Sequence, residues 1–272
     1  MNIQGKCAVV TGAASGIGRA VVAELAKHGA RAVALVDRSE EVRKVAETIN
    51  VAGGGNTVPE VMIGDVCDEA FRRKTFDHMC SKYGPPVVCV PAAGITRDQL
   101  AVKVDKQTAK ASIYPVENFR LVVEVNLIAP VFWAIETIAR VAEHRMAQGL
   151  KRWDPKEGPQ GTIVFIGSIS SQGIPGQVSY SATKAALEGV AETLSKEAGF
   201  YGVRLAVVHP GFTDTPMVRS LGQEYIDKNI LPYTQLKRLI EPAEIADAIY
   251  FMIRNTACSG ELWADAGWHP QA

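Results

Sequence analysis

Cys7-Ala-Val-Val-Thr-Gly-Ala-Ala-Ser-Gly-Ile-Gly18 is the stretch that decides the fold. Its apolar start predicts a short strand, and the amphipathic residues from Arg19 to His28 predict a helix directly after it. Glycines at such a junction permit positive φ angles, let the backbone approach a pyrophosphate, and aim the N–H groups of the helix N-terminus at its negative charge. We therefore expect a dinucleotide-binding turn. Its predicted contacts are Gly12, Ser15, Gly16, Ile17 and Gly18.

An acidic residue, Asp37, occupies the position at which a dinucleotide-binding fold places a carboxylate. The second apolar run, 32–36, ends in Asp37, at about the distance along the chain where an acidic side chain meets the adenosine ribose hydroxyls. A carboxylate accepts from the 2′-hydroxyl of NAD but repels the 2′-phosphate of NADP, so NAD is the expected cofactor and NADP the less favoured one. The competing interpretation is a local turn in which Asp37 only caps a helix.

Apolar runs and helical patterns alternate along the whole chain. Strands are expected near 7–11, 32–37, 58–63, 87–91, 162–167, 203–209 and 261–264. This alternation predicts an α/β fold with a doubly wound, seven-stranded parallel sheet that carries helices on both faces, Rossmann-like, in a single dinucleotide-binding and catalytic domain spanning 1–272. Ligands of such sheets collect at the carboxyl ends of the strands. Residues that follow predicted strands are Gly12, Asp37, Asp65, Gly94, Ser168 and Pro210.

Tyr180 and Lys184 lie four residues apart, which places a phenol and an ammonium on one face of a helix. A phenol titrates near ~10, whereas a general acid or base works best near the operating pH. A unit charge about 4 Å away contributes about 4 kcal/mol at an effective dielectric of ~20, enough to remove about three pKa units. We expect Lys184, helped by an oxidised nicotinamide, to lower the pKa of Tyr180. The spacing alone is also common in ordinary helices.

The glycine spacing together with Tyr180 and Lys184 resembles the short-chain dehydrogenase/reductase family in its single-domain subtype, over nearly the whole chain. The resemblance implies hydride transfer between a nicotinamide cofactor and a secondary alcohol or ketone, with Tyr180 as general acid/base. It implies that Ser168 binds the substrate oxygen, that Lys184 also holds the ribose, and that Asn126 orders a water. Ser170 and Ser171 stay open as alternatives, because the gap from Ser168 to Tyr180 is shorter than the family pattern.

The resemblance also implies further cofactor contacts. Asp65 and Val66 match the adenine-edge segment, and Ala93 and Gly94 permit close approach after the fourth strand, where Pro91 replaces the usual Asn. The segment that holds the nicotinamide amide and the phosphates matches Pro210, Gly211, Phe212 and Thr215. Ser15 stands where many NADP-preferring members have a basic residue, which favours NAD, whereas Arg38 offers a 2′-phosphate a partner.

Three functions compete. The leading one is an NAD(H)-dependent oxidoreductase that interconverts a secondary alcohol and a ketone. The second is a 3-oxoacyl-thioester reductase using NADPH, because Gly94-Ile-Thr-Arg-Asp98 is similar to the loop of those enzymes. The third is a dinucleotide-sensing module without turnover. Substrate choice is expected to depend on Ile95–Pro115 and Phe212–Arg238, whereas the long segment Ala147–Gly161 is expected to be a solvated loop at the opposite edge.

The composition of the chain limits which binding partners and which location are expected. The chain has 29 Lys and Arg against 29 Asp and Glu, so its formal net charge is zero, which favours neither nucleic acid nor an anionic membrane as a partner. We see no charged-then-apolar leader and no apolar run approaching ~18 residues, so a cytoplasmic location is expected. The family suggests a homodimer or homotetramer acting on a small-molecule alcohol or ketone.

Cysteine and histidine usage predicts no metal site. The five cysteines, Cys7, Cys67, Cys80, Cys89 and Cys258, lack paired ligand spacing and are interpreted as small buried apolar residues. His209, immediately before Pro210, is interpreted as structural, although the end of a strand could also bring it to the nicotinamide region.

Overall fold

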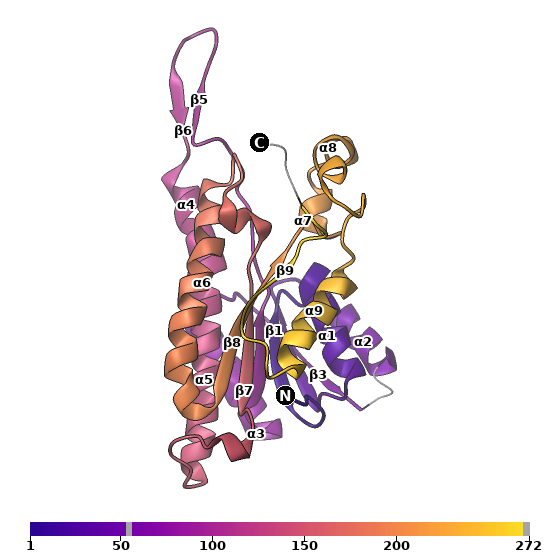
Figure 1. The fold of residues 1–272 in the computed structure, drawn as a ribbon, viewed down its shortest axis with the longest axis vertical. Coiled ribbons are helices and arrows are strands. Elements are labelled where there is room, and N and C mark those ends of the chain that lie inside the picture. The colour runs from indigo at the N-terminus through magenta and orange to yellow at the C-terminus, as the bar shows by residue number, and fades with distance from the viewer. Residues whose placement is uncertain (53–55, 269–272) are drawn as a thin grey trace.

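A parallel sheet of seven strands forms the centre of the molecule (Figure 1). The structure is a computed structural model that describes residues 1–52 and 56–268. The strand order is β3-β2-β1-β4-β7-β8-β9, and each neighbouring pair is parallel. The strands are β1 (Cys7–Thr11), β2 (Ala32–Asp37), β3 (Val58–Ile63), β4 (Pro86–Pro91), β7 (Gly161–Ile166), β8 (Val203–Pro210) and β9 (Gly260–Ala264). The predicted sheet is confirmed, with every strand boundary within one residue.

Helices cover both faces of the sheet, as predicted. One face packs against α1 (Gly16–Lys27), α2 (Val42–Ala52) and α9 (Pro242–Arg254). The other packs against α3 (Glu69–Tyr83), α5 (Ala129–Ala147) and α6 (Val178–Ala198). Successive residues of β1 alternate between the two cores: Ala8 and Val10 belong to the first, Cys7 and Val9 to the second. This two-sided burial explains why the strands read as continuous apolar runs.

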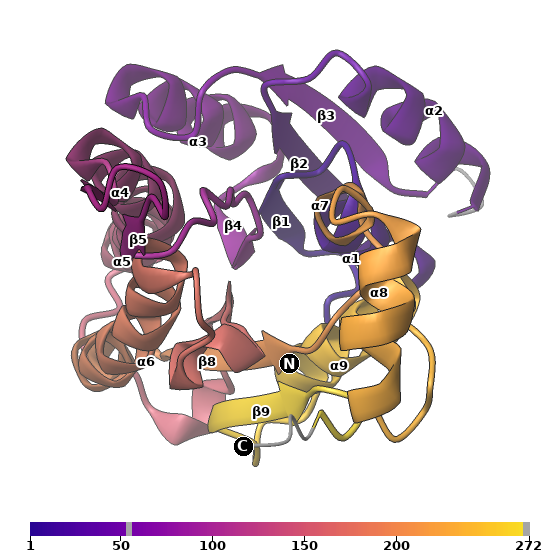
Figure 2. The same cartoon turned by 90° about the horizontal axis from the view of Figure 1, so that it is seen from above.

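The strand order reverses between β1 and β4, because the chain crosses to one side of β1 to make β2 and β3 and returns to the other side for β4. Such a switch point opens a crevice at the carboxyl ends of the strands. Figure 2 looks onto this edge, where the short helices α4 (Val116–Val123), α7 (Pro216–Arg219) and α8 (Gln223–Asn229) stand around the strand ends.

The segment Ile95–Pro115 contains a structure that the sequence analysis missed. β5 (Val102–Val104) and β6 (Ala111–Ile113) pair antiparallel as a hairpin that extends beyond the carboxyl edge (Figure 1). Its base is fixed near α6, because the Tyr114 hydroxyl bonds the Arg97 carbonyl at 2.8 Å and the Ser179 Oγ at 2.9 Å. The segment therefore lies at the carboxyl edge of the sheet, as expected from its place after β4.

The segment Ala147–Gly161 lies before β7, at the opposite edge, as expected, but it is more than a solvated loop. It holds the 3₁₀ turn η2 (Pro155–Glu157), whose Glu157 accepts from the buried Arg145 guanidinium at 2.5 Å. The Trp153 ring packs against Gly202. Three further 3₁₀ turns are η3 (Ile169–Gln172), η4 (Gly199–Tyr201) and η5 (Leu231–Tyr233).

A long apolar helical segment runs from α4 through the π-helical turn η1 (Glu124–Ile128) into α5. By length and composition alone, Val116–Ala147, with a window of mean hydropathy 1.7, suffices to cross a membrane. No uninterrupted apolar run of about 18 residues is present, because Glu124 and Glu136 interrupt this segment, but its average hydropathy is higher than the sequence analysis implied. Trp133, Ala134 and Val141 of this segment are buried in the core beneath the sheet, and core helices pass the same test.

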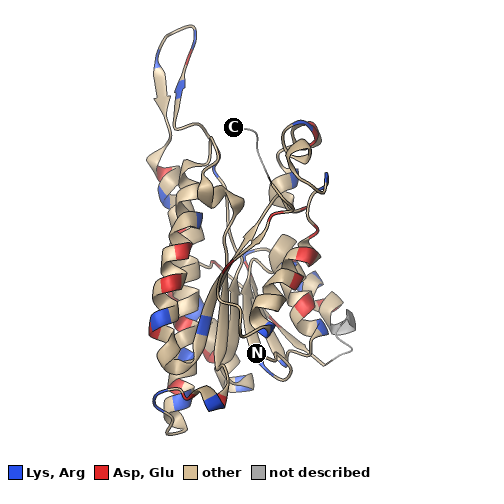
Figure 3. Ribbon diagram, viewed as in Figure 1, with Lys and Arg blue, Asp and Glu red and all other residues tan. Residues whose placement is uncertain are grey.

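Lys and Arg residues are interspersed with Asp and Glu residues along the outer helices, while the strands contain few charged residues (Figure 3). This distribution agrees with the zero formal net charge of the sequence.

Candidate active site

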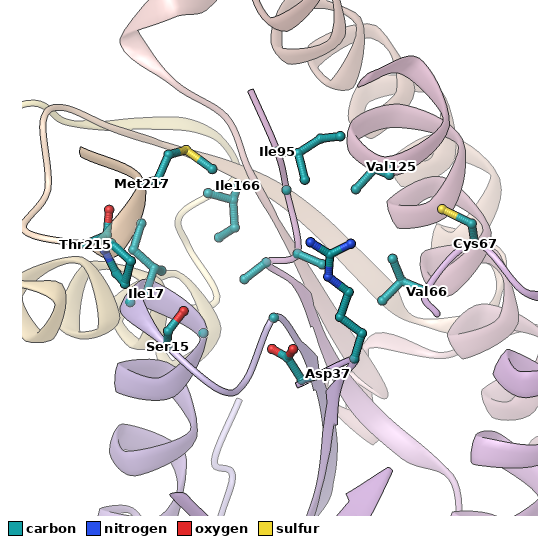
Figure 4. Close-up of a pocket in the computed structure, with 18 of the residues that line it drawn as sticks. Ser15, Ile17, Asp37, Val66, Cys67, Ile95, Val125, Ile166, Thr215 and Met217 are labelled. Carbon is teal, nitrogen blue, oxygen red and sulfur yellow. The ribbon is translucent and has the colours of Figure 1, made fainter. Parts of the chain in front are cut away.

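A cleft of about 550 Å³ opens at the carboxyl ends of β1, β2, β3 and β4. Figure 4 shows Ser15, Ile17 and Thr215 on one side of it and Val66, Ile95 and Val125 on the other. Thirteen predicted cofactor contacts line this cleft: Gly12, Ser15, Gly16, Ile17, Gly18, Asp37, Asp65, Val66, Ala93, Gly94, Tyr180, Lys184 and Thr215. Gly211 and Phe212 line a neighbouring pocket instead, and Pro210 is buried at the end of β8.

The glycine turn has the close approach that its sequence predicts. Gly12 has a φ of 67°, and a Cβ there would lie 2.8 Å from the Ala93 nitrogen. A Cβ at Gly18 would collide with the Gly12 carbonyl. Ser15, the N-cap of α1, makes no side-chain capping bond within the described part of the chain. The first N–H groups of α1 therefore remain available to a phosphate.

Asp37 braces the turn as well as lining the cleft. Its Oδ2 accepts from the Ala14 N–H and its Oδ1 from the Ser39 N–H, both at 2.9 Å. The carboxylate thus joins the end of β2 to the glycine turn. Each oxygen has a second lone pair with which it can accept a ribose hydroxyl.

Other hydrogen bonds hold the loop after β4, where Pro91 replaces the family Asn. Thr11 Oγ1 accepts from the Ala93 N–H at 3.1 Å and so connects β1 to this loop. The side-chain amide of buried Asn126, in the π-helical turn, accepts from the Ile95 N–H at 2.9 Å and donates to the Ile95 carbonyl at 2.8 Å. Asn126 therefore fixes the position of Ile95 at the cleft.

Lys184 is a buried cation at the floor of the cleft. Its Nζ donates to the Ile166 carbonyl at 2.7 Å and lies 5.4 Å from the Tyr180 ring centroid. Burial lowers the pKa of Lys184 to about 8. Burial also raises the pKa of Tyr180 to about 12, the Ser168 hydroxyl acting against this and the Asp98 charge adding to it. The expectation that Lys184 lowers the pKa of Tyr180 is not met in this structure, because desolvation outweighs a cation directed at a carbonyl.

A smaller pocket of about 80 Å³ adjoins the cleft, and Tyr180 and Met217 line both. Ser168 and Ser170 line this pocket, whereas Ser171 is not among its lining residues. Ser168 Oγ accepts from the Ser170 N–H at 3.0 Å, and the Ser170 hydroxyl donates to Gln177 Oε1 at 2.8 Å. The remaining walls are largely apolar and include Phe212, Met217, Val218 and Leu221.

Sequence reasoning missed two polar residues of the pocket. Gln177 Nε2 donates to Asp98 Oδ2 at 2.7 Å, and burial raises the pKa of Asp98. Their only signal was that Asp98 falls in the segment expected to shape substrate entry. Cys67 was also missed, because it was interpreted as a buried apolar residue. It is part-exposed in the cleft (Figure 4), and burial together with the Asp65 charge raises its pKa to about 12, which favours the protonated thiol at neutral pH.

Known proteins resemble this chain in sequence and in fold. The family model "short chain dehydrogenase" matches residues 6–226. A 3-oxoacyl-[acyl-carrier-protein] reductase FabG from Pseudomonas aeruginosa is 31% identical, covering 94% of this chain and 93% of that protein. A (3R)-3-hydroxyacyl-CoA dehydrogenase from Canis lupus familiaris is 30% identical, covering 93% and 90%. The crystal structure of a short-chain type dehydrogenase/reductase from Mycobacterium marinum superposes with a TM-score of 0.80 at 26% identity, covering 98% of this chain and 96% of that one.

The sheet, the glycine turn and the matches define a nicotinamide-dinucleotide oxidoreductase that acts on CH–OH groups. The chain belongs to the short-chain dehydrogenase/reductase family.

The buried ammonium of Lys184 predicts a gain in stability when its charge is removed. Replacing it with Met keeps the length of the side chain. Because the pKa falls from 10.5 to about 8 on folding, the charge destabilises the fold by roughly 3 kcal/mol, and loss of the Ile166 bond returns about 1 kcal/mol. Lys184→Met should therefore raise the free energy of unfolding in urea at pH 7 by about 2 kcal/mol.

The pH dependence of the stability gain tests whether the buried charge of Lys184 causes it. The wild-type penalty is complete below pH 8 and disappears as pH rises from about 8 to 10.5, so the gain should shrink across that window. The matched control is Lys196→Met on the same helix, since Lys196 is exposed and should change stability by less than about 0.5 kcal/mol. A gain at Lys184 that is the same at pH 7 and pH 10 would contradict the assignment.

Proposed function

We propose that the protein is an NAD(H)-dependent oxidoreductase that interconverts a secondary alcohol and a ketone, with Tyr180 as general acid/base. One observation carries this proposal: Tyr180 lines both the cofactor-sized cleft and the small pocket. A group at that junction reaches a carbon exposed to the cofactor and an oxygen held in the pocket. We further propose that residues 1–272 act as one dinucleotide-binding and catalytic domain, in the cytoplasm, as a homodimer or homotetramer.

Each proposed catalytic residue has a defined role. The nicotinamide supplies or accepts the hydride when it is bound. Tyr180 gives its phenolic proton to the ketone oxygen during reduction and removes the hydroxyl proton during oxidation. Ser168 donates a hydrogen bond to the same oxygen and so stabilises its developing charge. Asn126 fixes the loop at Ile95 and orders a water that serves the proton path to Lys184.

The pKa values suit these tasks. A phenol whose pKa is raised to about 12 stays protonated at neutral pH, which is the form that donates to a ketone. Lys184, with a pKa of about 8, loses and regains a proton easily near neutral pH, so it can restore the proton that Tyr180 gives up. Oxidation needs the phenolate and should therefore become faster as pH rises, whereas reduction should not.

The proposed cofactor contacts are the thirteen predicted residues that line the cleft together with Pro210, Gly211 and Phe212. Asp37, whose oxygens are 2.9 Å from the Ala14 and Ser39 nitrogens, supports NAD, because a bound 2′-phosphate would face a fixed negative charge. Arg38 and Arg97 also line the cleft, and they are the groups through which NADP would gain affinity.

A second candidate substrate class is the 3-oxoacyl thioester. The relatives from Pseudomonas aeruginosa and from Mus musculus, the latter 33% identical, are named 3-oxoacyl-[acyl-carrier-protein] reductases. The apolar wall of Met217, Val218 and Leu221 supports an acyl chain beside Tyr180. In this alternative the cofactor is NADPH. A panel of simple ketones and 3-oxoacyl-CoA thioesters, each with NADH and NADPH, separates the two classes.

Removing the phenolic hydroxyl tests the base. Tyr180→Phe should lower turnover by several powers of ten and leave dinucleotide affinity nearly unchanged, because the ring still packs in place. Steady-state kinetics and calorimetric titration with the dinucleotide measure the two effects. Retention of more than a tenth of the wild-type rate would remove Tyr180 from this role.

The three serines separate by geometry. Ser168→Ala should lower turnover by at least about a hundredfold, the usual effect of losing one oxyanion donor. Ser171→Ala should change turnover little. Ser170→Ala should have an intermediate effect, because its hydroxyl holds Gln177 in the same pocket. Turnover numbers at saturating substrate give the ranking, and a larger loss at Ser170 than at Ser168 would move the role to Ser170.

Cofactor choice depends on Asp37. The unmodified protein should turn over an accepted ketone with a higher kcat/KM for NADH than for NADPH, and Asp37→Ala should raise the relative use of NADPH. Asp77→Ala is the matched control, since this exposed carboxylate contacts Arg140 on the outer helices. A clear NADPH preference in the unmodified protein would favour the 3-oxoacyl alternative.

A further inference from the structure

Three side chains with metal-ligating atoms converge behind the proposed catalytic serine. His209 comes from the end of β8, Glu261 from β9 and Glu188 from α6. His209 Nε2 lies 3.3 Å from Glu261 Oε2 and 3.9 Å from Glu188 Oε1, and one ligand atom from each residue lies within 4.8 Å of the others. Three elements thus bring one imidazole and two carboxylates together, outside the cleft and the pocket described above.

His209 is fully buried, yet its Nε2 has no hydrogen-bond partner among residues 1–52 and 56–268. Glu261 is close enough for an ion pair but is not aligned with the N–H direction. A buried polar nitrogen left without a partner destabilises the fold. The ring cannot easily turn away, because Trp263 stacks on it at a centroid distance of 4.2 Å and an interplanar angle of 9°. The unsatisfied Nε2 of His209 therefore indicates a ligand between this atom and the two carboxylates.

We propose that Glu188, His209 and Glu261 bind a divalent cation of the zinc class. Imidazole with two carboxylates is a donor set that Zn²⁺ accepts, and ligand bonds of about 2.0–2.1 Å in a tetrahedron place donor atoms about 3.3 Å apart. The observed separations of 3.3 and 3.9 Å are close to this geometry. The cation also neutralises two carboxylates whose ligand atoms lie within 4.8 Å of each other. Both glutamates are partly exposed, 32% and 40%, which gives a path for entry and room for a water as fourth ligand.

The other nitrogen of His209 connects this site to the loop of Ser168. Nδ1 lies 3.3 Å from both the Ser168 N–H nitrogen and the Ser168 carbonyl oxygen. A Cβ at Gly167 would lie 2.5 Å from Nδ1, so only a glycine permits this contact. A cation on Nε2 leaves the proton on Nδ1, which then donates to the Ser168 carbonyl. Cation binding would thus fix the main chain at Ser168. This consequence rests on the proposed function, whereas cation binding itself does not.

The test uses the full-length protein, stripped with EDTA and titrated with ZnCl₂ by isothermal calorimetry. We expect one saturable site per chain that weakens at least tenfold in Glu261→Gln and in Glu188→Gln, and that is lost in the double variant. These changes keep side-chain size on partly exposed positions. Circular dichroism confirms that the variants fold. Zinc should raise the melting temperature of the wild type but not of the double variant, because the ion binds only the folded protein.

Glu60→Gln is the matched control, since Glu60 contacts His78 at 2.7 Å and no second carboxylate within the described ranges contacts that ring. Its zinc affinity should equal that of the wild type. Unchanged affinity in the double variant would assign the zinc to other groups, such as a cysteine, and would overturn the proposal. The absence of saturable binding up to about 1 mM zinc in the wild type would also overturn it. Neither result depends on turnover, so the outcome stands even if no substrate is found.

Discussion

The carboxyl ends of β1 and β4 approach so closely that only a glycine fits between them. A Cβ at Gly12 would lie 2.8–2.9 Å from main-chain atoms of Ala92 and Ala93. Because these strands flank the switch point of the sheet, this contact determines where the helix α1 begins and therefore where its free N–H groups point. The Asp37 carboxylate then joins β2 to the same turn, and Thr11 joins β1 to the loop after β4. The dinucleotide cleft follows from this one close approach.

The buried charge at the floor of the cleft lowers the stability of the fold and favours proton transfer. The buried ammonium of Lys184, held by one carbonyl, weakens the fold, yet its lowered pKa brings proton exchange into the neutral range. The same burial shifts the pKa of Tyr180 in the opposite direction, upward. Tyr180 and Lys184 lie one helical turn apart, in an environment that disfavours the charged form of each. That environment raises the pKa of the phenol and lowers the pKa of the ammonium. Such pairs are typical of sites where a proton is passed between partners.

The sheet could be predicted from the sequence because each strand buries both faces and so reads as an apolar run, such as Ala32–Val36. The glycine turn and the Tyr180–Lys184 pair were equally legible, since their spacing is local. The hairpin β5–β6 was missed, because three exposed residues per strand carry no burial pattern. The expected lowering of the Tyr180 pKa by Lys184 is not met, since spacing does not reveal desolvation. Glu188, His209 and Glu261 converge only through the fold, so the sequence predicted no metal ligands there.

The π-helical turn at Glu124–Ile128 acts as a phase shift in an otherwise continuous helix. One additional residue in that turn rotates the side chains of the preceding helix α4 by about 100° about the helix axis relative to those of α5. The turn is what directs the Asn126 amide at Ile95 while Trp133, further along, stays in the core. Loss of a single residue here would restore a regular helix and rotate α4, together with the hairpin before it, around the helix axis. The chain length of this segment is therefore as strongly constrained as its composition.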